Sequence, residues 1–352
     1  MNSRVLGAQQ SQEWRAALEK FPETDTYFLP EYHVAYEANG DGTAKAFIVE
    51  DQGDLLFYPF MMRHIENIAG EVVTEPWYDI ETVYGYSGPL SSTTDAGFLG
   101  RAWQEFSRWC HDERIVAEFI RFNPLMKNHE YMDETCQVEL DRETVAIRLD
   151  CTEEELWSNY RKGHRSKVRK AISGGLVCEE VALTDGISQF RELYDATMDR
   201  SEAGQYYHFS DAYFDHLCTG LSDSLKLFTV RDGDHLVAAT MFLATGDRIH
   251  AHLGGSEPGY QQLRPNNLLI HTMATWGRER GYRWLHLGGG RTADPDDTVY
   301  RFKASISRLR VPFNTGKRIH NQHAYQSLCS QWTRQMGESD RPSYFLLYRL
   351  GD

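Results

Sequence analysis

The chain has 352 residues, of which 41% are hydrophobic and 25% are charged, an ordinary balance for a folded globular protein. This length exceeds what one hydrophobic core usually supports, so we expect two domains. The formal net charge of −14 makes the surface repel polyanions, which argues against DNA as a partner. Any contact with RNA is expected to be local, for example with the acceptor end of a tRNA.

The sequence also argues against a membrane protein and against a metal site. No apolar run approaches the roughly 20 residues of a membrane-spanning helix, and the first 19 residues contain no apolar signal core. We therefore expect a cytoplasmic protein without a membrane span. Zinc-ligand spacing is absent, and a disulfide framework is not expected, because the six cysteines are widely separated: Cys110, Cys136, Cys151, Cys178, Cys218 and Cys329.

The first 150 residues predict a mixture of helices and strands. A short amphipathic helix is expected over 11–20, and alternating apolar residues predict a hairpin with strands 44–50 and 55–62. Apolar residues at helical spacing predict a helix near 98–113. Strands are expected at 116–122 and 144–149.

After Asp150 a similar order of elements begins again. Thr152 and Glu155 have the spacing of a capping box at the start of a helix. The remaining helices are expected at 164–173, 187–200, 211–221 and 266–280, and the strands at 177–181, 226–231, 235–245, 249–253, 284–287 and 343–350. The repetition predicts a duplicated mixed α/β unit, with domains at 1–150 and 151–352.

A basic helix is the first candidate for chemistry. Seven of the ten residues from 161 to 170 are Arg, Lys or His. Val168, Ala171 and Ile172 are expected on one buried face with Tyr160 and His164, and the pair 174–175 should form a left-handed helix end. The charged side chains suit a phosphate or pyrophosphate, with Arg165, Lys167 and Arg169 as candidate ligands. The alternative is a solvated face balanced by the acidic residues at 153–155.

A glycine-rich strand end is the second candidate. Gly288, Gly289 and Gly290 follow the strand at 284–287 and would let a ligand approach the backbone closely. An acidic loop and then Phe302 and Lys303 come after them.

These motifs together resemble the Fem-like peptidyltransferases, which are built from two GNAT-fold domains. The resemblance spans about residues 75 to 310 and rests on these segments: Lys167–Ala171 followed by Gly-Gly-Leu, Pro265–Leu269, Leu287–Gly290 with Phe302-Lys303, Tyr84–Pro89 and Arg121–Pro124. It implies an α/β fold of two tandem GNAT-like domains, with the active site in the second.

The resemblance also implies an activity: an amine attacks the carbonyl of an activated acyl donor to form an amide. The donor would be aminoacyl-tRNA or acyl-CoA, used as a co-substrate without a permanently bound cofactor. The acceptor would be a small-molecule or nucleotide-linked amine from cell-envelope, polysaccharide or metabolite synthesis. The family's lysine corresponds to Lys303, where it would steady negative charge. Phe302 and Asp297 complete the expected catalytic set, and the further substrate-binding candidates are Arg264, Asn267, Arg291 and Tyr300.

One segment departs from the usual acetyl-CoA pattern. The stretch from 259 to 267 lacks the glycines that hold pyrophosphate, and Pro265 removes one amide donor. Arg264 either contacts phosphate directly or makes a structural ion pair at the helix start. No general base is evident, because a lone strand histidine such as His252 or His286 is more often a core residue. Two alternatives therefore remain: an acetyl-CoA-dependent N-acetyltransferase of an amino sugar or similar metabolite, and a non-catalytic anion-binding module.

Overall fold

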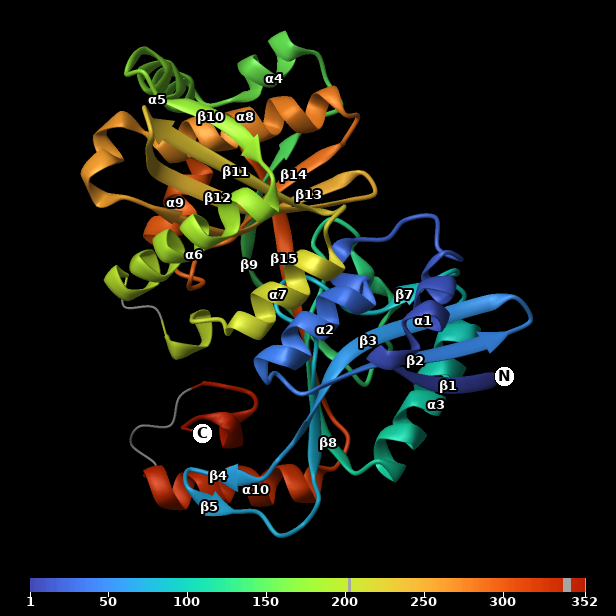
Figure 1. Ribbon diagram of the computed structural model, residues 1–352. Helices are drawn as coiled ribbons and strands as arrows, with labels where there is room; N and C mark the ends of the chain where they lie inside the picture. The colour runs from blue at the N-terminus through green and yellow to red at the C-terminus, as the bar shows by residue number, and fades with distance from the viewer. Residues whose placement is uncertain (202–203, 338–342, 352) are drawn as a thin grey trace. The chain divides into compact units, whose positions relative to one another are not determined.

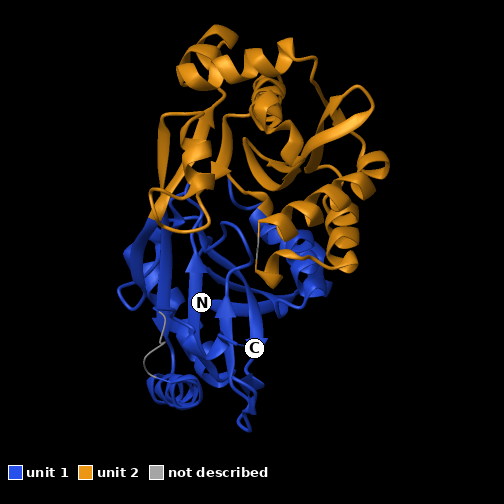
Figure 2. Cartoon of the chain, turned by 90° about the vertical axis from the view of Figure 1, so that its left-hand side faces the viewer, with its two compact units in different colours: residues 1–22, 27–141, 313–352 blue, residues 23–26, 142–312 orange. Residues whose placement is uncertain are grey.

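Two copies of one β-α-α-β-β-β-α-β unit make up the chain in the computed structural model, which describes residues 1–201, 204–337 and 343–351. Unit 1 contains residues 1–22, 27–141 and 313–352, and unit 2 contains residues 23–26 and 142–312 (Figure 2). The duplicated α/β unit predicted from the sequence is confirmed. The division between the units differs from the predicted boundary at 150, because residues 313–352 belong to the first unit.

The sheet strands of unit 1 follow the order β1-β2-β3-β6-β8-β15, and β7 pairs with β3. Only β6 and β8 are parallel, and α3 connects them. The repeated part contains β1 (Asn2–Gly7), α1 (Ser11–Leu18), α2 (Pro30–Asn39), β2 (Thr43–Asp51), β3 (Asp54–His64), β6 (Tyr78–Glu81), α3 (Ala96–Asp112) and β8 (Ile115–Arg121). The other elements are β4 (Asn67–Ile68), β5 (Glu71–Val72), β7 (Leu90–Ser91), β15 (Leu309–Ile319) and α10 (Gln322–Met336).

Unit 2 repeats this arrangement with a sheet in the order β9-β14-β13-β12-β11-β10, in which only β13 and β14 are parallel. Its repeated elements are β10 (Val177–Val181), α6 (Leu183–Arg200), α7 (Asp211–Gly220), β11 (Leu225–Asp232), β12 (His235–Thr245), β13 (Arg248–Ser256), α8 (Pro265–Glu279) and β14 (Trp284–Gly288). The elements outside the repeat are β9 (Gln137–Arg148), α4 (Glu153–Asn159), α5 (Lys162–Ser173) and α9 (Thr298–Ala304).

In each unit, the strand at one end of this order comes from outside the unit's own repeat. β15 follows the second repeat in sequence but pairs with β8 of unit 1. The end of β9 follows the first repeat but pairs with β14 of unit 2. This exchange of last strands explains why a boundary drawn from local pattern at residue 150 differs from the compact units.

Residues on alternate sides of the unit 2 strands have different surroundings, as expected for a pleated sheet. Ile249, Leu285 and Leu287 point into a buried cluster with residues of α5 and α8. Helix α6 packs against the strands β11, β12 and β13, and it lies across the sheet from α5 and α8 (Figure 1). The next residues in register, His250 and His286, point to the side opposite the apolar cluster.

Several local predictions are confirmed. Thr152 accepts from the Glu155 amide, and the Glu155 carboxylate accepts from the Thr152 amide, which completes the capping box. His164, Val168 and Ala171 are buried on α5. Gly175 has the left-handed φ of +85°, which glycine adopts without strain.

Other local predictions are wrong. Ile172, expected on the buried face of α5, is 56% exposed, because it lies at the end of the helix where that face turns to solvent. Gly174 has a negative φ, so only one of the two glycines is left-handed. The strand predicted at 343–350 contains a 3-10 turn, Leu347–Arg349. Its consecutive residues Leu346 to Tyr348 are all buried against α10, which the alternation of a half-buried strand does not permit.

Candidate functional site

The predicted catalytic residues lie on α9 and in the loop between β14 and α9. The ammonium of Lys303 donates to the carbonyl of Gly289 at 2.7 Å. The Lys303 residue as a whole is partly exposed to solvent, but its ammonium is surrounded by protein atoms. Burial therefore lowers the pKa of Lys303 to about 8, although the charge of Asp297 acts in the opposite direction. Phe302, on the same helix, is partly buried against the core of unit 2.

Asp297 holds the glycine-rich turn in place. Its Oδ1 accepts from the amides of Val299 and Tyr300, each at 2.9 Å, and so caps α9. Its Oδ2 accepts from the amides of Arg291 and Thr292. Burial acts to raise the pKa of Asp297, but the backbone hydrogen bonds outweigh it and the pKa lies below its ordinary value. These contacts make Asp297 the N-terminal cap of α9. The catalytic role expected for Asp297 from the sequence stays a prediction.

The three glycines each have a steric or conformational reason. Gly288 has a φ of +77°, a conformation that strongly favours glycine. A β-carbon at Gly289 would lie 3.1 Å from the side chain of Arg142. A β-carbon at Gly290 would lie 2.5 Å from the Asp297 carboxylate. The turn is therefore specialised for close packing between β14 and α9, as well as for exposing backbone.

Two further candidates flank this turn. Tyr300 donates through its hydroxyl to Glu143 at 2.9 Å, and Arg291 is exposed and donates to the carbonyl of Ser201 at 3.4 Å. A small cavity of about 110 Å³ lies beside the turn and includes Gly290 and Tyr300 in its lining. The structure thus brings the candidates from 288 to 303 into one neighbourhood.

The basic candidates form a second group where α5 and α8 begin. The buried Asn267 contacts His164 (Nδ2 to Nδ1, 2.9 Å), which joins the first turns of the two helices. Burial, followed by the charges of His271 and Lys167, lowers the pKa of His164 to about 3. Arg264 is exposed just before α8, with a left-handed φ of +65°. Its guanidinium forms no ion pair in the described part of the chain, so the predicted structural ion pair is not seen there.

Two of the predicted phosphate ligands have contacts within the protein. Nη1 of Arg165 donates to the carbonyls of Trp157 and Ser158, in the last turn of α4, and to the carbonyl of Tyr160, directly after it. The guanidinium of Arg169 lies over the Trp157 ring, 5.2 Å from its centre. The basic helix is joined to the α9 region through its backbone, because the Arg161 amide donates to the carbonyl of Ile306.

These contacts predict that Arg165 stabilises the fold. Replacing Arg165 by methionine leaves three carbonyls without their donor and is expected to lower the free energy of unfolding by about 1–3 kcal/mol. Urea unfolding followed by circular dichroism measures the change. The control is Lys170→Met, which removes an exposed cation from the same helix and should have little effect. Equal stability of the two variants would contradict the structural role.

Sequence reasoning missed a buried polar network in unit 2, formed by Asp25, His250, His286 and Thr144. All four side chains are at most 1% exposed. His250 and His286 are the last paired residues of the parallel strands β13 and β14. No local pattern marks Asp25, which reaches this network from a four-residue segment, 23–26, far away in the sequence.

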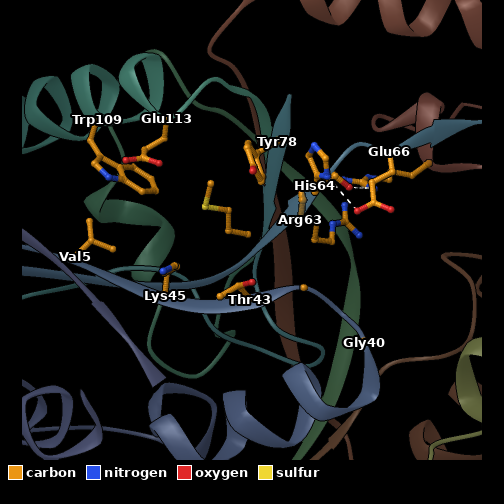
Figure 3. A pocket seen from close by; sticks show the side chains of 13 residues that line it. Val5, Gly40, Thr43, Lys45, Arg63, His64, Glu66, Tyr78, Trp109 and Glu113 are labelled. Atoms are coloured by element: carbon orange, nitrogen blue, oxygen red, sulfur yellow. Dashed lines mark hydrogen bonds and ion pairs between the residues drawn. The ribbon is translucent and has the colours of Figure 1, made fainter. Parts of the chain in front are cut away.

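Unit 1 contains a separate cavity of about 630 Å³ (Figure 3). Trp109, Tyr78 and Lys45 contribute to its walls, and Arg63 and Arg349 at one side are paired with Asp79. None of the predicted site residues lines it.

Two kinds of feature are not found among the described residues. Across residues 1–201, 204–337 and 343–351, no helix combines the length and apolar character required to cross a bilayer. Within the same ranges, no three His, Cys, Asp or Glu side chains gather in a way that could hold a metal ion.

Comparison with known proteins identifies the fold. Residues 158–303 match the family described as "Acetyltransferase (GNAT) domain". The structure of FemX aligns with a TM-score of 0.69 at 16% identity, over 93% of this chain and 99% of that one. L-PGS from Bacillus licheniformis aligns with a TM-score of 0.55 at 12% identity, over 87% and 91% of the two chains.

A third similar structure is the C-terminal domain of a protein described as a lysylphosphatidylglycerol synthetase from Agrobacterium fabrum. Its TM-score is 0.55 at 12% identity, over 89% of this chain and 93% of that one. A search of curated protein sequences finds no match. The chain therefore has a tandem GNAT fold similar to that of FemX, and residues 158–303, in its second unit, are similar to the acetyltransferase (GNAT) domain family.

Proposed function

We propose that the protein transfers an acyl or aminoacyl group from an activated donor to an amine and so forms an amide. The observation that carries this proposal is the separation of β13 and β14. Their pairing ends at His250 and His286, but β13 continues to Ser256. The glycine-rich turn and the ammonium of Lys303 follow the end of β14. There the backbone groups of β13 and β14 no longer form hydrogen bonds with each other.

The corresponding region of unit 1 is closed, which favours unit 2 as the reacting unit. There β6 and β8 pair up to Glu81 and Phe119. Ser87 forms a further parallel bridge with Phe122, and the Thr82 hydroxyl accepts from the amide of Arg121 at 2.8 Å. Hydrogen bonds in unit 1 therefore continue past the point where the pairing of the parallel strands ends in unit 2.

Lys303 would act where negative charge develops during the reaction. The amine attacks the donor carbonyl, the C–N bond forms, and the C–O or C–S bond to the leaving group breaks. The proton lost by the amine passes to the leaving group. A cation near the carbonyl stabilises the tetrahedral oxyanion, and such electrostatic stabilisation is often the largest contribution to catalysis.

The start of α8 supports a phosphate-bearing donor, either aminoacyl-tRNA or acyl-CoA. No side chain caps this helix, whereas Asp95 caps the equivalent helix α3 of unit 1. An uncapped helix start offers its positive dipole end to an anion, although Pro265 has no amide and the Asn267 amide donates to the carbonyl of Arg264. The first turn of α5 lies beside it through the contact between Asn267 and His164, and Lys167 and Arg264 add positive charge to this region.

Aminoacyl-tRNA is the donor we favour. Pro265 stands at the start of α8 and a 3-10 turn, Pro258–Leu263, precedes it, so the glycine loop that usually holds a CoA pyrophosphate is replaced. A structural relative is named for lysylphosphatidylglycerol, a lipid that carries an aminoacyl group. The acceptor is an amine on a small molecule or on a nucleotide-linked precursor.

The test supplies each donor separately to the purified protein. Charged tRNA and acyl-CoA pools are incubated with a panel of amino sugars, peptides and nucleotide-linked amines, and mass spectrometry detects new amides. Product from charged tRNA that disappears after ribonuclease treatment supports the proposal. Product from acetyl-CoA alone would replace it with the N-acetyltransferase alternative. Binding of donor without turnover of any acceptor would indicate an anion-binding module.

A further inference from the structure

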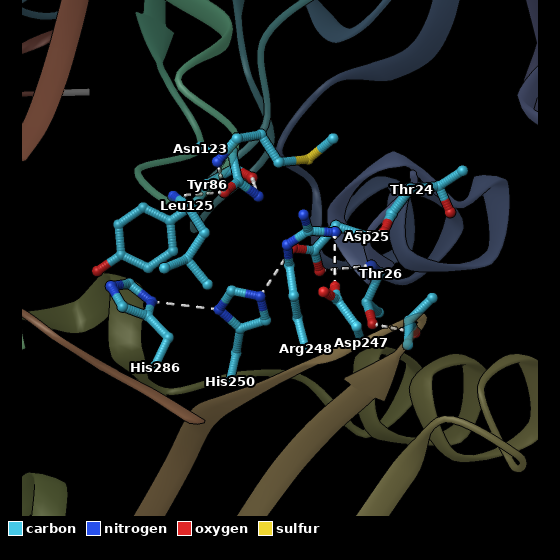
Figure 4. A network of polar contacts seen from close by, with 12 residues as sticks. Thr24, Asp25, Thr26, Tyr86, Asn123, Leu125, Asp247, Arg248, His250 and His286 are labelled. Atoms are coloured by element: carbon cyan, nitrogen blue, oxygen red, sulfur yellow. Dashed lines mark hydrogen bonds and ion pairs between the residues drawn. The ribbon is translucent and has the colours of Figure 1, made fainter. Parts of the chain in front are cut away.

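The buried network of unit 2 forms one continuous line of hydrogen bonds, of which Figure 4 shows the part from Asp25 through His250 to His286. Asp25 Oδ2 lies 2.8 Å from His250 Nε2, and His250 Nδ1 lies 3.2 Å from His286 Nδ1. His286 Nε2 is 2.8 Å from the Thr144 hydroxyl, which donates to the carbonyl of Val311 at 3.0 Å. The other oxygen of Asp25 accepts from the amide of Thr26 at 2.7 Å.

These contacts fix where the protons lie. Because the Thr144 hydroxyl donates to a carbonyl, it accepts from His286 Nε2, which must carry hydrogen. Burial, followed by the charges of His250 and Lys303, lowers the pKa of His286 well below its ordinary value. His286 is therefore neutral, and its Nδ1 is an acceptor. His250 Nδ1 must then be the donor in the contact between the two rings.

The remaining contact requires one more proton. His250 already carries hydrogen on Nδ1, and its Nε2 faces a carboxylate oxygen of Asp25. Two lone pairs cannot share a contact of 2.8 Å without a proton between them. The pair therefore holds this proton as an imidazolium and a carboxylate, or as a neutral ring and a carboxylic acid. The ion pair is favoured because imidazole is the stronger base.

The positive end of this pair faces the candidate active site. His250 lies between Asp25 and His286, at the point where β13 and β14 separate. Lys303 lies close enough to His286 for its charge to lower the pKa of that ring. The ionisable groups near His250 are Asp25, His252, His286 and, on its own strand, Arg248, which is paired with Glu23 and Asp247.

We propose that Asp25 and His250 form a buried carboxylate–imidazolium pair that supplies part of the positive field of the acyl-transfer site. Asp25 is a positioning residue, because it acts through His250 and touches no reacting atom. A fixed dipole of this kind needs no reorganisation when negative charge develops on the donor carbonyl. The inference deepens the proposed function and rests on it for its catalytic consequence, whereas the protonation of the pair is independent of it.

Asp25→Asn is the test, because the amide can replace the two hydrogen bonds described above, to the Thr26 amide and to His250. Its oxygen accepts from the Thr26 amide, and its nitrogen donates to His250 Nε2. The geometry is retained, but His250 loses its second proton. The matched control is Asp247→Asn, which neutralises an acidic residue that pairs with Arg248 and lies outside the network.

Two measurements need no substrate. Nitrogen-15 NMR of the histidine rings should show His250 doubly protonated at pH 8 in the native protein and neutral in Asp25→Asn. The pKa of Lys303, followed by NMR titration of labelled lysine, should rise in Asp25→Asn because the nearer positive charge is lost. An Asp247→Asn protein should retain the native His250 signal. A neutral His250 in the native protein at pH 8 would overturn the proposal.

Activity gives the catalytic consequence. With the donor and acceptor found in the assay above, kcat of Asp25→Asn should fall on the order of tenfold, less than for loss of a direct oxyanion donor. KM for the donor should stay unchanged, because the pair acts on the transition state. An unchanged kcat together with an altered His250 signal would show that the pair has no catalytic part. If no donor gives product with the native protein, the proposed function fails, and the NMR result still decides the state of the pair.

Discussion

Replacing Lys303 by methionine is expected to lower kcat by about 100- to 1,000-fold, the range found when a donor to an oxyanion is removed. Methionine retains most of the side-chain volume and removes only the ammonium. The hydrogen bond to the Gly289 carbonyl is lost as well, so stability must be measured in parallel. A folded variant with nearly full activity would show that the role assigned to Lys303 is wrong.

The pH dependence separates two roles for this lysine. Because its pKa is lowered to about 8, the cation is lost as pH rises through 8, and a rate that needs the cation should fall there. If Lys303 instead acts as a general base, the neutral amine is the active form and the rate should rise through pH 8. Lys303→Arg stays charged over this range, so in the first case its alkaline limb should move to higher pH.

Acidification is expected to destabilise the protein strongly between pH 6.5 and 5.5. His33, His164 and His286 are fully buried, and burial lowers the pKa of His33 to about 4, of His164 to about 3 and of His286 well below its ordinary value. The unfolded chain binds a proton at each ring below pH 6.5, but the folded protein does not. At pH 5.5 each ring therefore lowers the free energy of unfolding by about 1.4 kcal/mol relative to its value well above pH 6.5. The three rings together lower it by about 4 kcal/mol.

Urea unfolding at several pH values measures this loss. His164→Gln offers a matched control, because glutamine can still contact Asn267 but does not titrate. Its unfolding free energy should fall less steeply below pH 6.5 than that of the native protein. A native unfolding free energy that stays constant from pH 7.5 to 5.5 would contradict the buried, neutral state of these rings.

The two units differ at the position where chemistry is proposed. Both have the same strand order and the same helix between their parallel strands. In unit 1 the parallel pair is extended by the bridge from Ser87 to Phe122, and an aspartate caps the connecting helix. In unit 2 the pair stops early and the helix start has no cap. One fold therefore provides a closed unit and an open one through changes in a few loop residues.

The amino-acid sequence by itself determined the local elements. The hairpin of β2 and β3, the hairpin of β11 and β12, the capping box at Thr152 and the helix beginning at Pro265 follow from alternation, capping chemistry and the geometry of proline. The glycine-rich turn and Lys303 were also recognised from sequence, and the structure places them in contact. These features depend on neighbours within a few residues, and such interactions leave a readable pattern.

Only the tertiary structure decided the contacts between distant segments. The exchange of β9 and β15, the use of Arg165 to cap α4, and the docking of Asp25 on His250 have no local signature. Asp25 and His250 are separated by 225 residues in sequence. The position of a strand or side chain that contacts a distant segment depends on its burial and hydrogen bonding in the folded protein. Those surroundings exist only after the chain has folded. For that reason the sequence indicated the acyltransferase fold, and the structure alone revealed the buried histidine pair beside its candidate site.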